Sequence, residues 1–367
     1  MNSIFQISDS LTAKEILARL AEWSSLTYKV LESAWEEYVQ KLLDRKTPYG
    51  KSFIHLISSG LHNPSSEIGV YADGAKTYED ELFGDFFSKI IHLYHGFDRT
   101  TQKHTENFDI DDIAVEDLNA HATDSCKALS VRVRYAFALD NFPFQSAMTR
   151  EQRKDAESAI CAALDNLPEV LHGTYESLEN MSAERRQQLI TEHFLSPTEE
   201  DPFLVNAGMT TDWPIGRGIY LSNDKTFFTL VNDEDNRVGV LEQGWDIKKI
   251  FQKLASANHI FNSYLRIARN ATYGKLVSCP TNIGTGMRLS VMLTLPKLAQ
   301  DMDALKKKAK TLWLSVRGHY GEHSGVWSRW EVDISNKARL GISEREIAQL
   351  VYNGARELMK MEITYTS

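Results

Sequence analysis

The sequence predicts an α+β protein with a small all-α N-terminal domain and a larger domain that contains strands. Three observations support this fold class. Apolar residues recur at helical spacing through the first hundred residues, a polar and acidic segment occupies residues 98–129, and strand patterns alternate with helix patterns after it. The 367 residues are enough for two domains. We place the boundary inside the polar segment, which gives domains 1–105 and 106–367.

The N-terminal helices are predicted from apolar stripes and one capping box. Thr12 and Glu15 have the capping-box spacing that starts a helix. Residues with helical spacing follow, and we expect them to form a core: Ile16, Leu17, Leu20, Ala21, then Trp35, Tyr38, Val39, Leu42, Leu43, then Phe53, Ile54, Ile57, Leu61, and finally Phe83, Phe86, Phe87, Ile90, Ile91 and Tyr94. The segment from Asn63 to Tyr71 is rich in turn formers and, on its own, is typical of a surface loop.

Strands that carry arginine on one face are predicted in the second part of the chain. Residues 130–138, 287–295 and 312–317 alternate between apolar and polar side chains, and residues 226–235 form a further strand that closes on an acidic cluster. Helices are predicted from the capping boxes at Thr149 and Ser343. Helices should cover the apolar faces, so the polar faces should meet on the open side of one sheet.

These polar faces carry Arg132, Arg134, Arg288 and Arg317, although the chain has a net charge of −9. Four arginines gathered in an acidic protein need an anion, and their planar donors suit a polyphosphate. The alternative is that each arginine pairs with a structural carboxylate.

Residues 278–290 combine a cysteine, a turn and an arginine. We expect a strand that ends at Cys279, a tight turn, and a return strand that carries Arg288, so that a thiol and a guanidinium face one cleft. The simpler interpretation is a small buried cysteine and a surface arginine.

Several functional classes are excluded by the sequence. It contains no GxxxxGK[ST] phosphate loop, no HExxH or CxxC metal motif, and no serine-centred nucleophile elbow. The acidic balance argues against nucleic acid or an anionic membrane as a partner. No apolar run is long enough to span a bilayer, and there is no signal-peptide pattern. Three widely spaced cysteines suit a reducing compartment, so we expect a cytoplasmic protein.

Six motifs together resemble the phosphagen (guanidino) kinases, and most closely the arginine kinases within that family. They are Ser130–Arg134, Gly216–Tyr220, Asn232–Asp235, Cys279–Thr285, Arg317–His323 and Asp333–Lys337. The resemblance implies the guanidino kinase, or glutamine synthetase-like, catalytic fold, in which an antiparallel sheet is flanked by helices. It also implies reversible transfer of the γ-phosphoryl group of MgATP to a guanidino nitrogen. The N-terminal domain would then serve the guanidino substrate, and the C-terminal domain would bind ATP.

The resemblance assigns roles to individual residues. The catalytic residues are Glu234, Glu322 and Cys279. The nucleotide-binding residues are Arg132, Arg134, His193, Arg237, Arg288 and Arg317, with Arg237 one residue earlier than the family pattern. The substrate loop supplies Ser66, Ile68, Gly69 and Tyr71, and Asp233 reaches Mg²⁺ through water. Segments 63–71 and 318–326 are the implied lids.

The chemistry explains the need for these residue types. A guanidinium has a pKa above ~12, so two carboxylates must grip it, orient one nitrogen and accept a proton. Nearby arginines and the Thr281 hydroxyl should favour an ionised thiol at Cys279, which would add a third anionic contact. Arginines and Mg²⁺ would neutralise the transferring phosphoryl group.

Two positions depart from the family pattern. Met292 stands where a second histidine would pack on adenine, and Glu67 stands where arginine kinases have glycine. The short loop and Tyr71 favour free arginine. The alternatives are another guanidino compound such as taurocyamine, a protein-arginine kinase, and an inactive nucleotide-binding paralogue. We expect a monomer or homodimer.

Overall fold

The computed structural model describes residues 11–21, 25–33, 36–63, 65–318 and 330–365. The N-terminal part is helical, as predicted. Its elements are α1 (Ala13–Ala21), α2 (Leu26–Glu32), α3 (Glu36–Leu43), α4 (Phe53–His62), the short helix η1 (Ala75–Tyr78) and α5 (Gly84–His95). The capping box before α1 is confirmed, since Thr12 N donates to Glu15 Oε2 at 2.8 Å. Trp35 lies outside the described residues.

The larger part is built on one antiparallel sheet of eight strands, in the order β2-β3-β4-β5-β1-β8-β10-β9. These strands are β1 (Ala128–Phe137), β2 (Gly173–Ser177), β3 (Gly218–Ser222), β4 (Phe227–Val231), β5 (Asn236–Gln243), β8 (Met287–Thr294), β9 (Leu314–Gly318) and β10 (Glu331–Asn336). A two-residue pair, β6 (Arg269–Asn270) and β7 (Gly274–Lys275), forms a separate hairpin. The predicted α+β fold with an antiparallel sheet is confirmed.

Helices flank this sheet. The longer ones are α6 (Arg150–Leu164), α9 (Ile247–Tyr264), α10 (Met302–Thr311) and α11 (Glu344–Thr364), and the shorter ones are α7 (Ala183–Thr191), α8 (Pro202–Asn206), η2 (Leu118–His121), η3 (Glu169–Leu171), η4 (Thr198–Glu200), η5 (Pro280–Asn282) and η6 (Leu298–Gln300). Both predicted capping boxes, Thr149 with Gln152 and Ser343 with Glu346, are present. No helix among the described residues is long and apolar enough to cross a membrane.

The main core lies between the apolar face of the sheet and the long helices. Val131, Val133, Tyr135 and Phe137 of β1 are buried there with residues of α6, α9 and α11. This confirms that helices take the apolar face and leave the arginine face open. The arginine face is not open along the whole sheet. At β3 and β4 a smaller apolar cluster, which includes Leu189 of α7, covers it.

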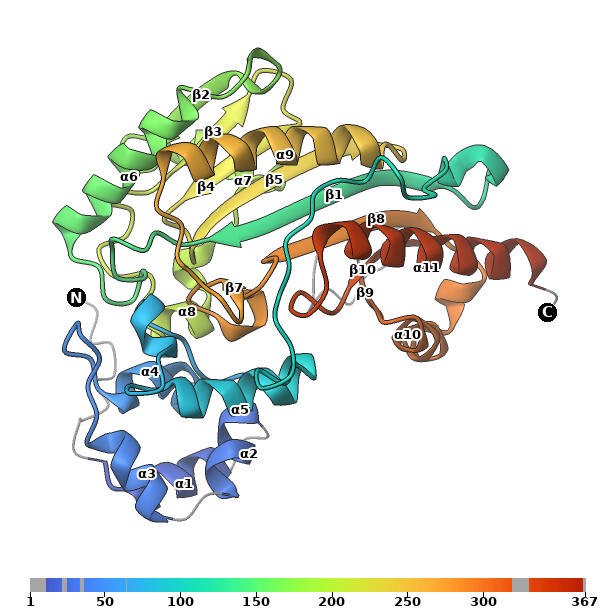
Figure 1. The fold of residues 1–367 in the computed structure, drawn as a ribbon. Helices are drawn as coiled ribbons and strands as arrows, with labels where there is room; N and C mark the ends of the chain where they lie inside the picture. The colour runs from blue at the N-terminus through green and yellow to red at the C-terminus, as the bar shows by residue number, and fades with distance from the viewer. Residues whose placement is uncertain (1–10, 22–24, 34–35, 64, 319–329, 366–367) are drawn as a thin grey trace.

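The helical N-terminal domain lies beside the larger domain, with α4 and α5 nearest to it (Figure 1). Its core continues into the larger domain through residues such as Phe144, Leu276 and Val277. Two hydrogen bonds to backbone carbonyl groups also join the two parts. The Tyr78 hydroxyl donates to Val277 O, and Ala72 N donates to Ser278 O, both at 2.8 Å.

Three predicted strand boundaries are wrong. The strand predicted from residue 312 begins at Leu314, because Trp313 has a left-handed φ of 59°. β4 stops at Val231, because Asn232 has a φ of 53° and the left-handed conformation turns the chain into β5. The predicted strand up to Cys279 is only the two-residue β7, and Cys279 instead caps η5, whose first residue, Pro280, has no N–H for a strand ladder.

A buried ion cluster fixes the segment that leads to Cys279. Lys275, which is fully buried, lies 2.6 Å from Glu106 and 3.5 Å from Glu344, and Glu106 also pairs with Arg269 at 2.8 Å. The cluster therefore ties the interdomain segment to β7 and to the first turn of α11.

We expect Lys275→Ala to lower the free energy of unfolding by about 3–5 kcal/mol, because it leaves Glu344 as a buried carboxylate without its cation. Urea unfolding measures this change. The matched control is Lys308→Ala, which removes a half-exposed pair with Glu357 at 3.9 Å and should cost no more than about 1 kcal/mol. Equal effects of the two substitutions would contradict the prediction.

Candidate active site

The open face of the sheet brings the predicted arginines together. Arg134 of β1 and Arg288 of β8 are direct partners across the strands, and Arg132 lies two residues along the same face. Arg317 of β9 is opposite Asp333 of β10 in the strand register, and Asp333 is in turn opposite Met292 of β8. Like charges placed opposite each other on a sheet are destabilising. This arrangement therefore costs free energy unless an anion lies over it.

Only part of this positive charge is neutralised by protein groups. The guanidinium of Arg288 contacts the Asp333 carboxylate, and its Nε donates to Ser335 Oγ at 3.2 Å. Burial lowers the pKa of Arg134 well below its usual range, and Arg132, Arg237 and Arg288 lower it further. The Nε atoms of Arg132 and Arg134 are buried without a hydrogen-bond partner among the described residues. The arginine face thus has unused donors and excess positive charge, as a polyphosphate site requires.

Arg132 connects this face to the segment of His193. Its Nη2 donates to the carbonyl oxygen of His193 at 2.8 Å, and its guanidinium lies 5.5 Å from the centre of the Phe228 ring. His193 follows α7 in the left-handed conformation, with a φ of 64°, and is exposed. Met292 is half-buried on the same open face as Arg288. Both predicted adenine-packing positions therefore border the arginine face.

The acidic segment forms the loop between β4 and β5. Asp233, Glu234 and Asp235 are all buried, and Arg237 at the start of β5 contacts the Glu234 carboxylate and lies 3.5 Å from Asp233. Burial lowers the pKa of Arg237, but the nearby carboxylates outweigh this effect and raise it above the usual range. Asp233 Oδ1 accepts from the Thr198 hydroxyl at 2.6 Å. No group of three or more metal-ligating side chains occurs among the described residues.

The turn of Cys279 is fixed at both ends. At its start, Ser278 donates from its N–H and hydroxyl to the Asp235 carboxylate. At its end, Thr285 donates to the carbonyl oxygen of Arg339 at 2.9 Å, while the Arg339 guanidinium contacts the side chain of Asn282. Sequence reasoning missed Arg339, because an arginine three residues after a strand has no distinguishing local pattern.

Cys279 itself differs from the sequence-based expectation. Its Sγ lies 3.1 Å from Thr281 Oγ1. Burial raises the pKa of the thiol to about 12, Glu234 raises it as well, and the hydrogen bonds with Thr281 only partly oppose these effects. Burial and the carboxylates of Glu234 and Asp235 therefore favour the neutral thiol in the ligand-free protein, in contrast to the ionised thiol that the sequence predicts.

The predicted substrate loop lies against α2 and α4. Gly69 N donates to Ser66 Oγ at 2.9 Å, and Ile68 O accepts from Thr27 N at 3.2 Å. Gly69 has a φ of 76° and lies so close to Gly60 of α4 that a side chain at either position would meet the other residue. Glu67 is exposed on this loop.

The loop ends beside the thiol. Burial raises the pKa of Tyr71, and interactions with Cys279 and Glu234 raise it further. Tyr94 of α5 was not predicted as a site residue, yet Arg339, Glu67, Cys279 and Arg317 all affect its pKa, which burial raises. Its aromatic position in a helix stripe looked the same as that of the core residues. Glu322 lies outside the described residues.

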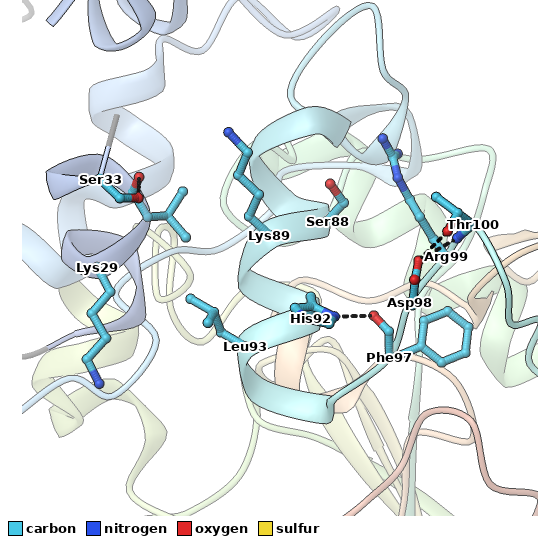
Figure 2. Close-up of a pocket in the computed structure, with 11 residues that line it drawn as sticks. Lys29, Ser33, Ser88, Lys89, His92, Leu93, Phe97, Asp98, Arg99 and Thr100 are labelled. Atoms are coloured by element: carbon cyan, nitrogen blue, oxygen red, sulfur yellow. Dashed lines mark hydrogen bonds between the residues drawn. The ribbon is translucent and has the colours of Figure 1, made fainter. Parts of the chain in front are cut away.

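A separate cavity lies elsewhere in the described part of the chain. It has a volume of about 460 Å³ and lies between α2 and α5, away from every predicted site residue (Figure 2). Its lysines, Lys29 and Lys89, point in opposite directions, and Lys89 Nζ lies 4.2 Å from the centre of the Tyr38 ring.

Two family models match the chain. One, described as ATP:guanido phosphotransferase, N-terminal domain, matches residues 22–92, and the other, the C-terminal catalytic domain of the same family, matches residues 155–365. The chain is similar to an arginine kinase from Limulus polyphemus, with 36% identity over 94% of this chain and 95% of that protein. It is also similar to an arginine kinase from Schistocerca americana, with 37% identity over 89% of this chain and 90% of that protein.

Two solved structures share the fold. Lombricine kinase has a TM-score of 0.83 and 29% identity, covering 94% of this chain and 93% of that one. The duplicated taurocyamine kinase from Schistosoma mansoni has a TM-score of 0.87 and 30% identity, covering 96% of this chain and 48% of that one. The present chain thus spans about half of the duplicated protein.

The raised pKa of Cys279 gives a direct prediction. Only the thiolate is alkylated, so the rate of reaction with iodoacetamide should rise about tenfold per pH unit from about pH 7 to about pH 10. Mass spectrometry of the Cys279 peptide measures this rate. The peptides of Cys126 and Cys161 serve as internal controls, since burial raises the pKa values of these thiols to about 11 and about 12. A rate that levels off below about pH 8 would show that the thiol is ionised.

Proposed function

Because the chain belongs to the ATP:guanido phosphotransferase family and is a guanidino kinase, we propose that its substrate is free L-arginine. The reaction would transfer the γ-phosphoryl group of MgATP reversibly to the guanidino nitrogen and give phosphoarginine and ADP. The observation that carries this proposal is that two kinds of site lie together. Arg134 and Arg288 carry more positive charge than the neighbouring carboxylates neutralise, and the carboxylate of Glu234 lies at the other end. One end of the site suits polyphosphate, and the other suits a guanidinium.

At the phosphate end, Arg132, Arg134 and Arg288 would hold the phosphates, and Arg317 would join them from β9. Their planar donors can bind phosphate oxygens bidentately and neutralise charge that develops during transfer. His193 and Met292 would pack on the two faces of adenine, with the thioether in place of a ring. Mg²⁺ would arrive as part of the substrate and keep several waters, one of which could contact Asp233.

At the guanidino end, Glu234 would grip the substrate. The contact between Glu234 and Arg237 is itself a guanidinium–carboxylate pair, so this carboxylate already binds the chemical group of the substrate. Glu234 and Glu322 would orient the reacting nitrogen and accept a proton. Cys279 would contact the substrate as a thiol, and binding of a guanidinium would favour its ionisation. Arg237 would add its remaining N–H groups to the phosphate site.

Ser66, Ile68, Gly69 and Tyr71 would hold the rest of the substrate. The support is the position of the loop, which ends with Tyr71 close to Cys279 and Glu234. We also propose that residues 1–105 form the guanidino-substrate domain and residues 106–367 the catalytic and ATP-binding domain. The free thiols of Cys126, Cys161 and Cys279 suit a cytoplasmic protein, and a monomeric or homodimeric state stays a prediction.

A second candidate substrate is another guanidino compound, such as taurocyamine or lombricine. The observation in its favour is Glu67, an exposed side chain on the substrate loop at the position where glycine would let the loop backbone come close to the carboxylate of arginine. The solved neighbours named for taurocyamine and lombricine show that this fold accommodates other guanidino kinases. The short loop and the arginine kinases among the relatives support arginine over these compounds.

A coupled ADP-release assay tests the substrate directly. Arginine, taurocyamine, lombricine, creatine and an arginine-rich protein are compared at equal concentration with MgATP. We expect kcat/KM to be highest for arginine and turnover of the arginine-rich protein to be negligible. A higher kcat/KM for taurocyamine or lombricine would overturn arginine as the substrate.

Arg134→Met tests the anion site by separating activity from stability. We expect kcat/KM for ATP to fall by about 10² or more, because a charge partner of the transferring phosphoryl group is lost. The free energy of unfolding of the ligand-free protein should stay equal or rise, because an apolar side chain replaces a buried charge that faces Arg288. ATP kinetics and urea unfolding provide the two measurements.

The matched control is Arg266→Met, which removes an exposed arginine that pairs with Asp140 at 2.9 Å. This variant should keep both its activity and its stability. Normal ATP kinetics in Arg134→Met would reject the anion site.

A further inference from the structure

Ser278 lies where three segments of the site meet. It is fully buried. Its N–H lies 3.2 Å from both carboxylate oxygens of Asp235, and its hydroxyl donates to Asp235 Oδ1 at 2.8 Å. Its carbonyl oxygen accepts from Ala72 N at 2.8 Å. One residue therefore joins the acidic loop, the cysteine turn and the segment after the substrate loop.

Each partner of Ser278 is next in sequence to a proposed site residue. Asp235 follows Glu234, Ala72 follows Tyr71, and Ser278 itself precedes Cys279. Consecutive Cα atoms are separated by a fixed ~3.8 Å. A shift at Ser278 is consequently passed to the carboxylate, the phenol and the thiol that surround the guanidino group.

The hydroxyl of Ser278 cannot be lost without cost. Asp235 is 2% exposed, and the hydrogen-bond donors that it has among the described residues both belong to Ser278. A buried carboxylate that loses a donor must find a new one or move, and Glu234 is its immediate neighbour. Ordinary burial of a small residue would not require a hydroxyl at this position.

We propose that Ser278 is a positioning residue for phosphoryl transfer, which sets the separation of Glu234, Cys279 and Tyr71 through its contacts with Asp235 and Ala72. The inference rests on the roles proposed above for Glu234 and Cys279. It does not depend on which guanidino compound is the substrate. Ser278 itself does not touch the reacting atoms.

The central experiment is Ser278→Ala, which removes the hydroxyl and keeps both backbone contacts. We expect kcat to fall by about 10- to 100-fold, because small displacements of reacting groups have large effects on rate. The KM for ATP should stay within about twofold, because the arginine face is not touched. Assays use the guanidino compound that the unaltered protein phosphorylates fastest, so failure of arginine as substrate leaves this test intact.

Two further variants distinguish positioning from general stability. Ser278→Thr keeps the hydroxyl and should recover most of the lost kcat, within about fivefold of the original value. Its extra methyl group at this buried position should lower the free energy of unfolding. Ser146→Ala is the matched control, because Ser146 is also buried but its hydroxyl has no hydrogen-bond partner among the described residues. This control should leave kcat unchanged. Urea unfolding of each variant gives the folded fraction used to normalise its rate.

A double-mutant cycle with Asp235→Asn locates the effect. If Ser278 acts through Asp235, the loss caused by Ser278→Ala should be smaller in a protein that already carries the Asp235→Asn substitution. Should Ser278→Ala fail to fold, Asp235→Asn alone must show the same loss of kcat with an unchanged KM for ATP. The proposal is overturned if Ser278→Ala or Asp235→Asn keeps full kcat, or if Ser278→Ala and Ser146→Ala lose kcat equally.

Discussion

The site depends on the repulsion between two arginines that face each other across adjacent strands. Arg134 and Arg288 are direct partners in the β1–β8 register, and the Asp333 carboxylate contacts the Arg288 guanidinium. A sheet can carry such a pair because its other face is strongly stabilised by burial against the long helices. The stability of the core thus maintains an arrangement of like charges that would not persist by itself. An anion over the open face relieves this repulsion. The free energy of the repulsion, which the folded protein already contains, then favours binding of the anion.

A buried acidic cluster with too little positive charge lies near this arginine pair. Glu234, Asp235 and Cys279 are buried close together, and Glu234 raises the pKa values of both Asp235 and Cys279. Arg237 is the cation that the described residues provide there, and it is shared between Glu234 and Asp233. This cluster lacks positive charge in the same way that the arginine face lacks negative charge. The two substrates of a guanidino kinase carry the missing charges, since one is a polyphosphate and the other a guanidinium.

The sequence could predict the elements better than their ends. The alternation at 130–138 and the capping boxes at Thr149 and Ser343 correctly located β1, α6 and α11, because burial on one face and a local cap are properties of neighbouring residues. The end of β4 depended on a left-handed Asn232 that alternation cannot reveal. Arg339, Tyr94 and Ser278 were missed because their importance comes from partners that are distant in the sequence. The prediction of the charge state of Cys279 failed for the same reason. The position of Arg288 in the sequence did not show that Glu234, which raises the pKa of the thiol, acts on it more strongly.

Arg237 stands at the junction of the two opposite fields, and with the roles proposed above it would couple the two halves of the site. It lies in the field of Arg134 on one side and is held by Glu234 on the other. A substrate guanidinium that binds Glu234 competes with Arg237 for the same carboxylate, which weakens the hold of the acidic loop on Arg237. A phosphate on the arginine face attracts Arg237 and frees Glu234. With these proposed roles, each substrate would improve the site of the other through one side chain, with no need for a long-range conformational path.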